Sequence, residues 1–366
     1  MWEAVKITVI TVLVFGVLIF VHELGHFIAC RIFGIRVNEF AIGMGPKLLS
    51  RQSKKSGTVY SVRAFPIGGF NNIEDGSVET TDAEGNEILY HPPREELPDY
   101  ALGAKPVWQR MIVMVAGALM NLILGLIIMT VIVISMEKYG STTVAYFLDT
   151  ETGEQIQEYS GLMAGDKIVK VGGRRVFTGD ELVYSIFAKG ADPVDVTVIR
   201  DGNKKVIEDV SFPTQEKQGI TFGIINFRIY SEEKNFVNTV KQSFFGSVNV
   251  VTQVVDSLVG IFTGKYGLEH MSGPIGVGEV IGQAAKYGLR SVMTITVMLS
   301  MNLGVFNLLP VPGLDGGKIV FIIIEWIRRK PIPTKIEENA TIVGITLLFA
   351  LGIVIAFKDT FAMIFR

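Results

Sequence analysis

The chain has little charge, one cysteine and four histidines. Only 19% of its 366 residues are Asp, Glu, Lys or Arg, and 49% are hydrophobic. Soluble domains carry about 25% charged residues, so this chain is depleted in charge and apolar overall. The single cysteine, Cys30, excludes an intramolecular disulfide framework. A formal net charge of −2 gives no basic footprint for nucleic acid, so no nucleic-acid partner is expected.

The hydrophobic residues are concentrated in four long runs, which begin near Ala4, Val107, Val292 and Ala340. Each run reaches the roughly 20 residues that a membrane-spanning helix requires. A buried core helix could explain one such run, but four in one chain favour transmembrane helices. The first run is too long and too interrupted by ionisable residues for a removable signal peptide, so we expect it to be retained.

The distribution of basic residues predicts the orientation. Lys and Arg gather in the loop after the first run and in the short loop before the fourth, whereas the termini carry few. Because basic loops stay in the cytoplasm, both termini and the long segment 137–290 are predicted to be extracytoplasmic. We therefore expect a multi-pass protein of the bacterial cell membrane.

The predicted fold is a polytopic α-helical membrane protein with four transmembrane helices, an inserted α/β domain and a membrane-associated β-hairpin-like loop. Its segments are residues 1–34 (first transmembrane helix), 35–105 (cytoplasmic or membrane-associated loop), 106–137 (second transmembrane helix), 138–228 (extracytoplasmic domain), 229–290 (amphipathic interfacial helices), 291–327 (third transmembrane helix) and 328–366 (basic loop and fourth transmembrane helix).

Residues 138–228 show short strand patterns and one helix. Strands are predicted at 143–148, 167–171, 194–200 and 206–211, and the helix at 179–188 has Thr178 as N-cap. Asp201-Gly202 is a hairpin signal. The glycine pattern through Gly161, Gly165 and Gly172-Gly173 resembles a PDZ domain of bacterial membrane proteases. Such domains bind extended peptides or unfolded segments by strand addition.

Three other segments allow more than one interpretation. Residues 58–65 alternate like a strand. The Gly-rich stretch 65–70 suits backbone in a tight bend or beside another chain, or is an ordinary turn. Residues 77–99 are acidic and are predicted to be a flexible surface loop. The amphipathic segment 236–264 either lies in the membrane interface or packs on the inserted domain.

The strongest motif is His22-Glu23-Leu24-Gly25-His26 inside the first apolar run. Two histidines four residues apart share one face of a helix and can bind one zinc ion, with the glutamate beside them as general base. Ionisable residues within a spanning helix are costly unless they are paired or functional. A polar helix end that binds nothing is the alternative.

Asp315 is the best third ligand. His91 lies in a polar loop and His270 on the outward side, whereas Asp315 follows the apolar run that contains Pro310 and Pro312. His22 lies about 27 Å along its helix, and Asp315 lies at a similar depth from the same side. The prolines would break the helix there. Irregular backbone at membrane depth is tolerated only where it is buried in protein or lines a water-filled cavity. Asp315 as an ordinary helix cap is the alternative.

These motifs resemble the site-2 protease family of intramembrane zinc metalloproteases, in its bacterial RseP-like group. The matching stretches are 22–26 and Asn307 to Gly317, with weaker matches at 66–70, 116–121 and 272–276. Two features depart from the family: there is room for one PDZ domain where some relatives have two, and Ala118 stands where proline is common.

The resemblance implies the roles of individual residues. His22, His26 and Asp315 would bind one Zn²⁺ per chain, with the active site towards the cytoplasmic side, and Glu23 would activate the attacking water. Asn307 and the loop residues Gly68, Gly69 and Phe70 would bind the substrate.

The resulting prediction is an intramembrane zinc metalloprotease that cuts transmembrane segments of single-span membrane proteins, such as anti-sigma factors or remnant signal peptides. Membrane lipids and a peptide at the PDZ domain are further expected partners. Two alternatives stay open, a divalent-metal transporter and a catalytically silent PDZ adaptor. Few polar residues in the outward halves of the runs argue against the transporter, and Glu23 between two ligands argues against the adaptor.

Overall fold

The computed structural model describes residues 2–81, 87–90, 92, 96–149, 152–217, 219–267 and 271–364. The chain divides into two compact units. One contains residues 1–125 and 254–366, and the other contains residues 126–253. His91 and His270, which were considered as ligands from the sequence, lie outside the described residues.

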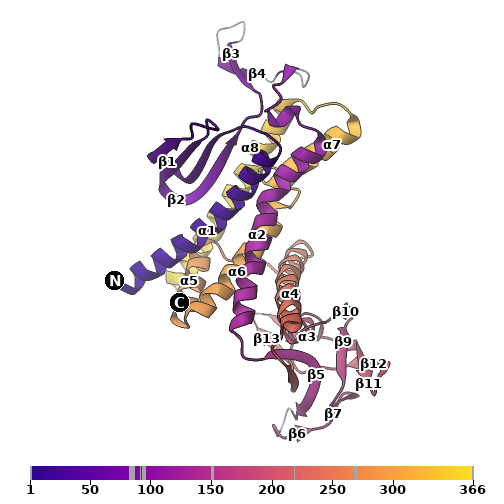
Figure 1. The fold of residues 1–366 in the computed structure, drawn as a ribbon. Helices are drawn as coiled ribbons and strands as arrows, with labels where there is room; N and C mark the ends of the chain where they lie inside the picture. The colour runs from indigo at the N-terminus through magenta and orange to yellow at the C-terminus, as the bar shows by residue number, and fades with distance from the viewer. Residues whose placement is uncertain are drawn as a thin grey trace. The chain divides into compact units, whose positions relative to one another are not determined.

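Long apolar helices dominate the chain (Figure 1). They are α1 (Trp2–Ile32), α2 (Val107–Ser135), α4 (Phe236–Phe262), α5 (Pro274–Lys286), α6 (Leu289–Asn307), α7 (Asp315–Arg328) and α8 (Thr334–Ile364), with a 3₁₀ turn η2 at Leu102–Ala104. Among the described residues, five helices are long and apolar enough to cross a membrane: α1, α2, α4, α6 and α8. The sequence predicts four, and α4 is the additional one. The chain is a helical, multi-pass membrane protein with an inserted β-sheet region.

The predicted third span, 291–327, is two helices rather than one. Helix α6 ends at Asn307, and α7 begins at Asp315 after a loop that contains both prolines. A Cβ added at Gly316 would lie 2.1 Å from the main-chain oxygen of Leu309, and one at Gly317 would lie 2.4 Å from that of Val311. The loop therefore folds back over the first turn of α7, and only glycine fits beneath it.

The loop after α1 forms a small sheet from β1 (Val37–Gln52) and β2 (Val59–Ile73), as the sequence predicts. Both strands fold back on themselves, because Ala41 pairs with Phe70 on one side and with Ser61 on the other. Residues 65–73 therefore form an outer strand. Both β1 and β2 contact α1 (Figure 1).

Two sequence interpretations of this region change. The stretch 65–70 lies within β2 and is not an ordinary turn, although Gly68 has φ of +89° and bends the strand. The segment predicted as a flexible loop contains a second hairpin, in which β3 (Val78–Thr81) pairs with β4 (Glu87–Tyr90). Its short strands carry little of the apolar alternation that would have predicted them.

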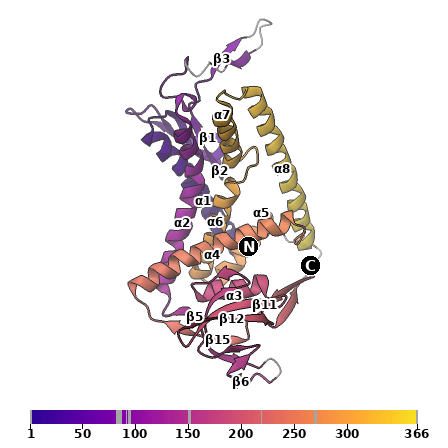
Figure 2. The same cartoon turned by 90° about the vertical axis from the view of Figure 1, so that its right-hand side faces the viewer.

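The second unit is a sheet with one short helix, α3 (Figure 2). The strand order is β12-β11-β9-β5-β15, with β10 beside β9 and β6 beside β5. The strands are β5 (Tyr139–Leu148), β6 (Gln155–Ile156), β7 (Glu158–Tyr159), β8 (Leu162–Met163), β9 (Lys167–Val171), β10 (Arg174–Arg175), β11 (Val194–Arg200), β12 (Asn203–Val210), β13 (Thr214–Lys217), β14 (Ile220–Gly223) and β15 (Phe227–Glu232), and α3 is Gly179–Lys189.

The predicted local signals of this unit are confirmed. Thr178 is the N-cap of α3, and its side chain accepts a hydrogen bond from the main chain of Glu181 while the Glu181 carboxylate accepts one in return. Asp201 and Gly202 have φ of +52° and +78° and join β11 to β12, as a two-residue hairpin requires. Arg200 donates to the buried carboxylate of Asp166 at 2.7 Å.

The first half of α4 packs on this sheet, which confirms one of the two sequence interpretations. The ring of Phe245 stacks on that of Phe177 with centroids 4.2 Å apart. The hydroxyls of Tyr139 and Thr239 lie 2.8 Å apart, and the Gln242 amide donates to the main-chain oxygen of Gly140.

Candidate metal centre and active site

The close approach of α1 and α2 sets the position of the two histidines. A Cβ at Gly25 would lie 2.3 Å from the main-chain oxygen of Ala116, and a Cβ at Gly117 would lie 2.3 Å from His26 Nε2. Real Cβ atoms do not come this close to other atoms, so both positions require glycine. The imidazoles of His22 and His26 then project from one face of α1 against the backbone of α2.

Three potential ligand atoms meet at this place. Asp315 Oδ2 lies 3.2 Å from His22 Nε2 and 3.2 Å from His26 Nε2. The two Nε2 atoms are also 3.2 Å apart. Both histidines are buried, at 9% and 6% exposure, and Asp315 is half-buried at the start of α7. The juxtaposition predicted from helix depth is therefore present, although 289 residues separate His26 from Asp315 in the sequence.

The hydrogen bonds around the histidines leave their Nε2 atoms free for a metal. His26 Nδ1 donates to the main-chain oxygen of Val113 at 2.7 Å, so its Nε2 carries a lone pair. His22 Nδ1 faces the side-chain amide of Asn121 at 3.2 Å, and the Oδ1 atom of that buried amide has no hydrogen-bond partner among the residues that the structure describes. Turning the amide by 180° places Oδ1 towards His22, where it accepts the Nδ1 proton. Ser300 donates to the main-chain oxygen of Asn121.

A divalent cation fits this donor set. Two nitrogen lone pairs and a carboxylate oxygen repel one another at 3.2 Å, and Asp315 Oδ2 is buried without a hydrogen-bond partner among the described residues. Tetrahedral zinc with bonds of about 2.0–2.1 Å separates its ligand atoms by roughly 3.3–3.4 Å, close to the observed spacing. Three protein ligands leave a fourth position, as in catalytic zinc sites.

Glu23 lies between the two histidines in sequence and is held by a residue that sequence reasoning missed. Asn71 Nδ2, on β2, donates to the carboxylate Oε2 and to the main-chain oxygen of Glu23, both at 2.7 Å. The Asn71 Oδ1 atom is buried and has no hydrogen-bond partner in the described part of the chain. The adjacent glycine motif was the only signal, since nothing in the sequence indicates that residues 48 positions apart meet.

The predicted substrate-binding residues are placed unequally. A Cβ at Gly69 would lie 3.3 Å from Glu23 Cγ, so the outer strand passes directly beside the proposed base. Phe70 pairs with Ala41, and the Arg63 guanidinium lies 4.8 Å from its ring centroid. Gly68 packs against Met44. Asn307 ends α6 half-buried, and its side chain has no hydrogen-bond partner in the described part of the chain.

Comparisons with known proteins identify the family of this chain. The model of "Peptidase family M50" matches residues 10–351. A Clostridium perfringens protein named "Putative zinc metalloprotease" is 34% identical, with 96% of this chain and 97% of that protein covered. "Zinc metalloprotease RasP" of Geobacillus kaustophilus is 29% identical (98% and 99% covered), and "Regulator of sigma-W protease RasP" of Bacillus subtilis is also 29% identical (95% and 96% covered). The match extends over nearly the whole chain, which therefore belongs to peptidase family M50.

Proposed function

We propose that this chain is a zinc-dependent endopeptidase of the membrane, which hydrolyses peptide bonds within transmembrane segments of other proteins. The observation that carries the proposal is the triangle of His22, His26 and Asp315, whose ligand atoms are 3.2 Å apart beside Glu23. His22, His26 and Asp315 would hold one Zn²⁺ per chain. The bound ion would polarise a water molecule and the scissile carbonyl.

Glu23 is the proton carrier of the proposed reaction. Its carboxylate accepts a proton from the attacking water and gives it to the nitrogen of the leaving amine. Asn71 fixes the carboxylate from one side, because its amide donates to both the side chain and the main chain of Glu23. One oxygen of Glu23 stays available to the water while the other is held.

The substrate binds as an extended segment along the outer strand of β2. A transmembrane helix hides its carbonyls in hydrogen bonds, so it must unwind before a carbonyl can be attacked. Strand addition to residues 65–73 supplies new main-chain partners for the unwound segment, and Gly69 lets it run beside Glu23. Asn307 and Phe70 would contact the same segment.

The proposed topology places the metal centre towards the cytoplasmic side. The basic loops carry Arg31, Arg51 and Arg328 and would face the cytoplasm. The unit of residues 126–253 would then be an extracytoplasmic PDZ domain, which binds a peptide or excludes substrates with bulky external domains. The chain would cross the membrane five times if α4 spans the bilayer and four times if α4 lies at the bilayer surface. We favour the surface, because the first half of α4 packs on the polar sheet unit.

The name of the Bacillus subtilis relative supports a substrate class. That protein is called a regulator of sigma-W protease. A single-span anti-sigma factor is therefore the first substrate to test, and a remnant signal peptide the second.

The decisive variant is Glu23→Gln. We expect it to abolish cleavage of a single-span model substrate in reconstituted vesicles and to retain bound zinc, because the amide keeps the size of the side chain but cannot accept the proton. Cleavage at the wild-type rate would contradict the proposal. Zinc flux into the vesicles that survives the substitution would indicate a transporter instead.

A further inference from the structure

A groove lies on the side of α1 that faces away from the metal centre. Phe20, Leu24 and Phe27 follow one another at helical spacing and form one wall. Leu24 is two residues from both His22 and His26, which places it about 200° around the helix from each. An occupant of the groove therefore touches none of the proposed zinc ligands.

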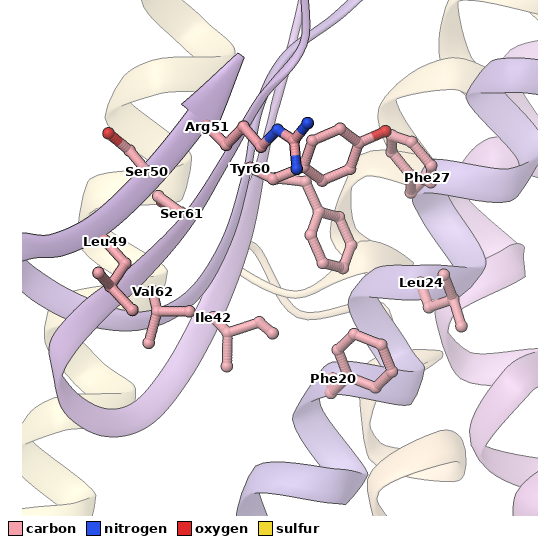
Figure 3. Close-up of a pocket in the computed structure, with 11 residues that line it drawn as sticks. Phe20, Leu24, Phe27, Ile42, Leu49, Ser50, Arg51, Tyr60, Ser61 and Val62 are labelled. Carbon is pink, nitrogen blue, oxygen red and sulfur yellow. The ribbon is translucent and has the colours of Figure 1, made fainter. Parts of the chain in front are cut away.

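The small sheet forms the opposite wall. Side chains two residues apart lie on the same face of a strand, and three neighbouring stretches each direct such a pair towards α1. The cavity between the walls measures about 560 Å³, and the paired sheet residues that line it are Phe40, Ile42, Leu49, Arg51, Tyr60 and Val62. Figure 3 shows five of them, Ile42, Leu49, Arg51, Tyr60 and Val62, on the sheet opposite α1.

The two ends of the groove differ in polarity. Leu49 and Val62 are 71% and 43% exposed at one end, where they open the cavity to the surroundings. Arg51 pairs with Tyr60 at the other end, and the centroid of the Tyr60 ring lies 5.9 Å from that of Phe27 (Figure 3). Arg31 follows one turn later on α1, with its guanidinium 5.2 Å from the Phe27 ring.

The charge at the polar end is uncompensated. Arg51 is exposed and has no ion-pair partner in the part of the chain that the structure describes. Arg31 donates only weakly, to the hydroxyl of Thr58 at 3.5 Å. Lys54 and Lys55 follow in the exposed turn between β1 and β2, and no acidic residue lines the described cavity.

We propose that this groove binds one anionic phospholipid, with an acyl chain in the cavity and the phosphate between Arg31 and Arg51. The apolar part of the cleft suits an acyl chain, and the guanidinium groups at its end suit the anionic headgroup. The polarity therefore changes along the groove in the same order as along the lipid. Free phosphate would leave the cavity unfilled. A substrate helix would have to bind against two positive charges.

The bound lipid would stabilise the sheet against α1. Residues 59–62 line the groove, and residues 65–73 of the same strand carry Asn71 to Glu23. The two walls do not touch across the cavity, and an acyl chain within it would make van der Waals contacts with both of them. Occupancy would therefore reduce local opening of β2 without adding any group to the reaction.

The test uses the full chain in phosphatidylcholine vesicles that contain phosphatidylglycerol with a photoreactive group at its acyl terminus. We expect crosslinks concentrated on peptides that contain Leu49 or Val62. Arg51→Gln should reduce this labelling about fivefold, the effect of one basic residue at an anionic surface. Val62→Trp, which fills the cavity, should remove it.

The matched control is Arg328→Gln, which removes the same charge from the other basic loop and should leave labelling unchanged. The elution volume and Tm of each variant show whether it is folded. If Val62→Trp does not fold, Arg51→Gln still tests the proposal. Equal labelling by photoreactive phosphatidylcholine, or crosslinks as dense along α8 as in the groove, would overturn the proposal. Displacement of the label by a single-span substrate, or by inorganic phosphate alone, would also overturn it.

Discussion

Asn71 Nδ2 lies 2.7 Å from the main-chain oxygen of Glu23 and 2.7 Å from its carboxylate. The first contact ties the outer strand of the sheet to α1, and the second sets the direction of the proposed base. A substrate segment added to this strand would thus be aligned with Glu23 by the same residue that orients the carboxylate.

Replacing Asn71 should slow the reaction without releasing the metal. A hydrogen bond to a charged group contributes about 1.5–3 kcal/mol, so Asn71→Ala should lower kcat about 10- to 100-fold while KM and zinc content change little. Steady-state cleavage of a single-span substrate measures kcat and KM separately. The matched control is Asn72→Ala at the exposed neighbouring position. An unchanged kcat in Asn71→Ala would show that the contact does not position Glu23.

The packing of α2 against the histidines should not tolerate a methyl group. Gly117→Ala places a Cβ 2.3 Å from His26 Nε2, so we expect zinc affinity to fall about 100-fold or more and cleavage to be lost. Gly16→Ala on α1 is the control, since nothing lies within 4 Å of its added Cβ. Normal zinc content in Gly117→Ala would mean that the two helices are farther apart than described.

Asn121 should tune the metal through His22. Outer-shell partners of zinc-bound histidines change metal affinity about 10- to 100-fold, and the Asn121 amide faces His22 Nδ1 at 3.2 Å. Asn121→Ala should therefore weaken zinc binding by that factor, as measured by competition with a chelator. Asn302→Ala, on the helix that also carries Ser300, is the comparison variant. Equal affinities in the wild type and Asn121→Ala would contradict the orienting role.

Glu39 should make the small sheet sensitive to acid. Burial favours a raised pKa, but hydrogen bonds from Ser61, Lys47 and Arg63 outweigh it and lower the pKa of Glu39 from 4.5 to about 2. The ionised form therefore stabilises the fold above pH 4.5, and this stabilisation is lost as the pH falls towards 2. Hydrogen exchange of β1 should accelerate over that range in the wild type. Glu39→Gln should be less protected at neutral pH and should lack this acid-dependent step.

Much of the fold is predictable because its signals are local. Apolar runs give α1, α2, α6 and α8, the Thr178 cap gives the start of α3, and the Asp201-Gly202 turn gives the hairpin of β11 and β12. The pairing of His22 and His26 follows from helix geometry. Asp315 could be predicted as the third ligand because its depth along the membrane-spanning run matches that of His22. The two prolines before it also indicate a break in the helix at that depth.

The remaining features depend on contacts between distant residues. Nothing in the alternation of residues 37–73 indicates that Ala41 pairs on both sides, or that Asn71 reaches Glu23. The ion pair between Arg110 and Glu325, at 2.6 Å, joins helices 215 residues apart. Strands β3 and β4 have four residues each, which is too short for a periodic pattern.

The most direct measurement of the central claim is zinc X-ray absorption spectroscopy on the purified full chain and on its Asp315→Ala variant. We predict about one zinc per chain in the wild type, with two imidazole nitrogens and oxygen ligands at about 2.0–2.1 Å. In Asp315→Ala we expect much weaker zinc binding and a changed oxygen shell. An identical spectrum and zinc content in the two proteins would show that Asp315 is not a ligand and that the proposed metal centre is wrong.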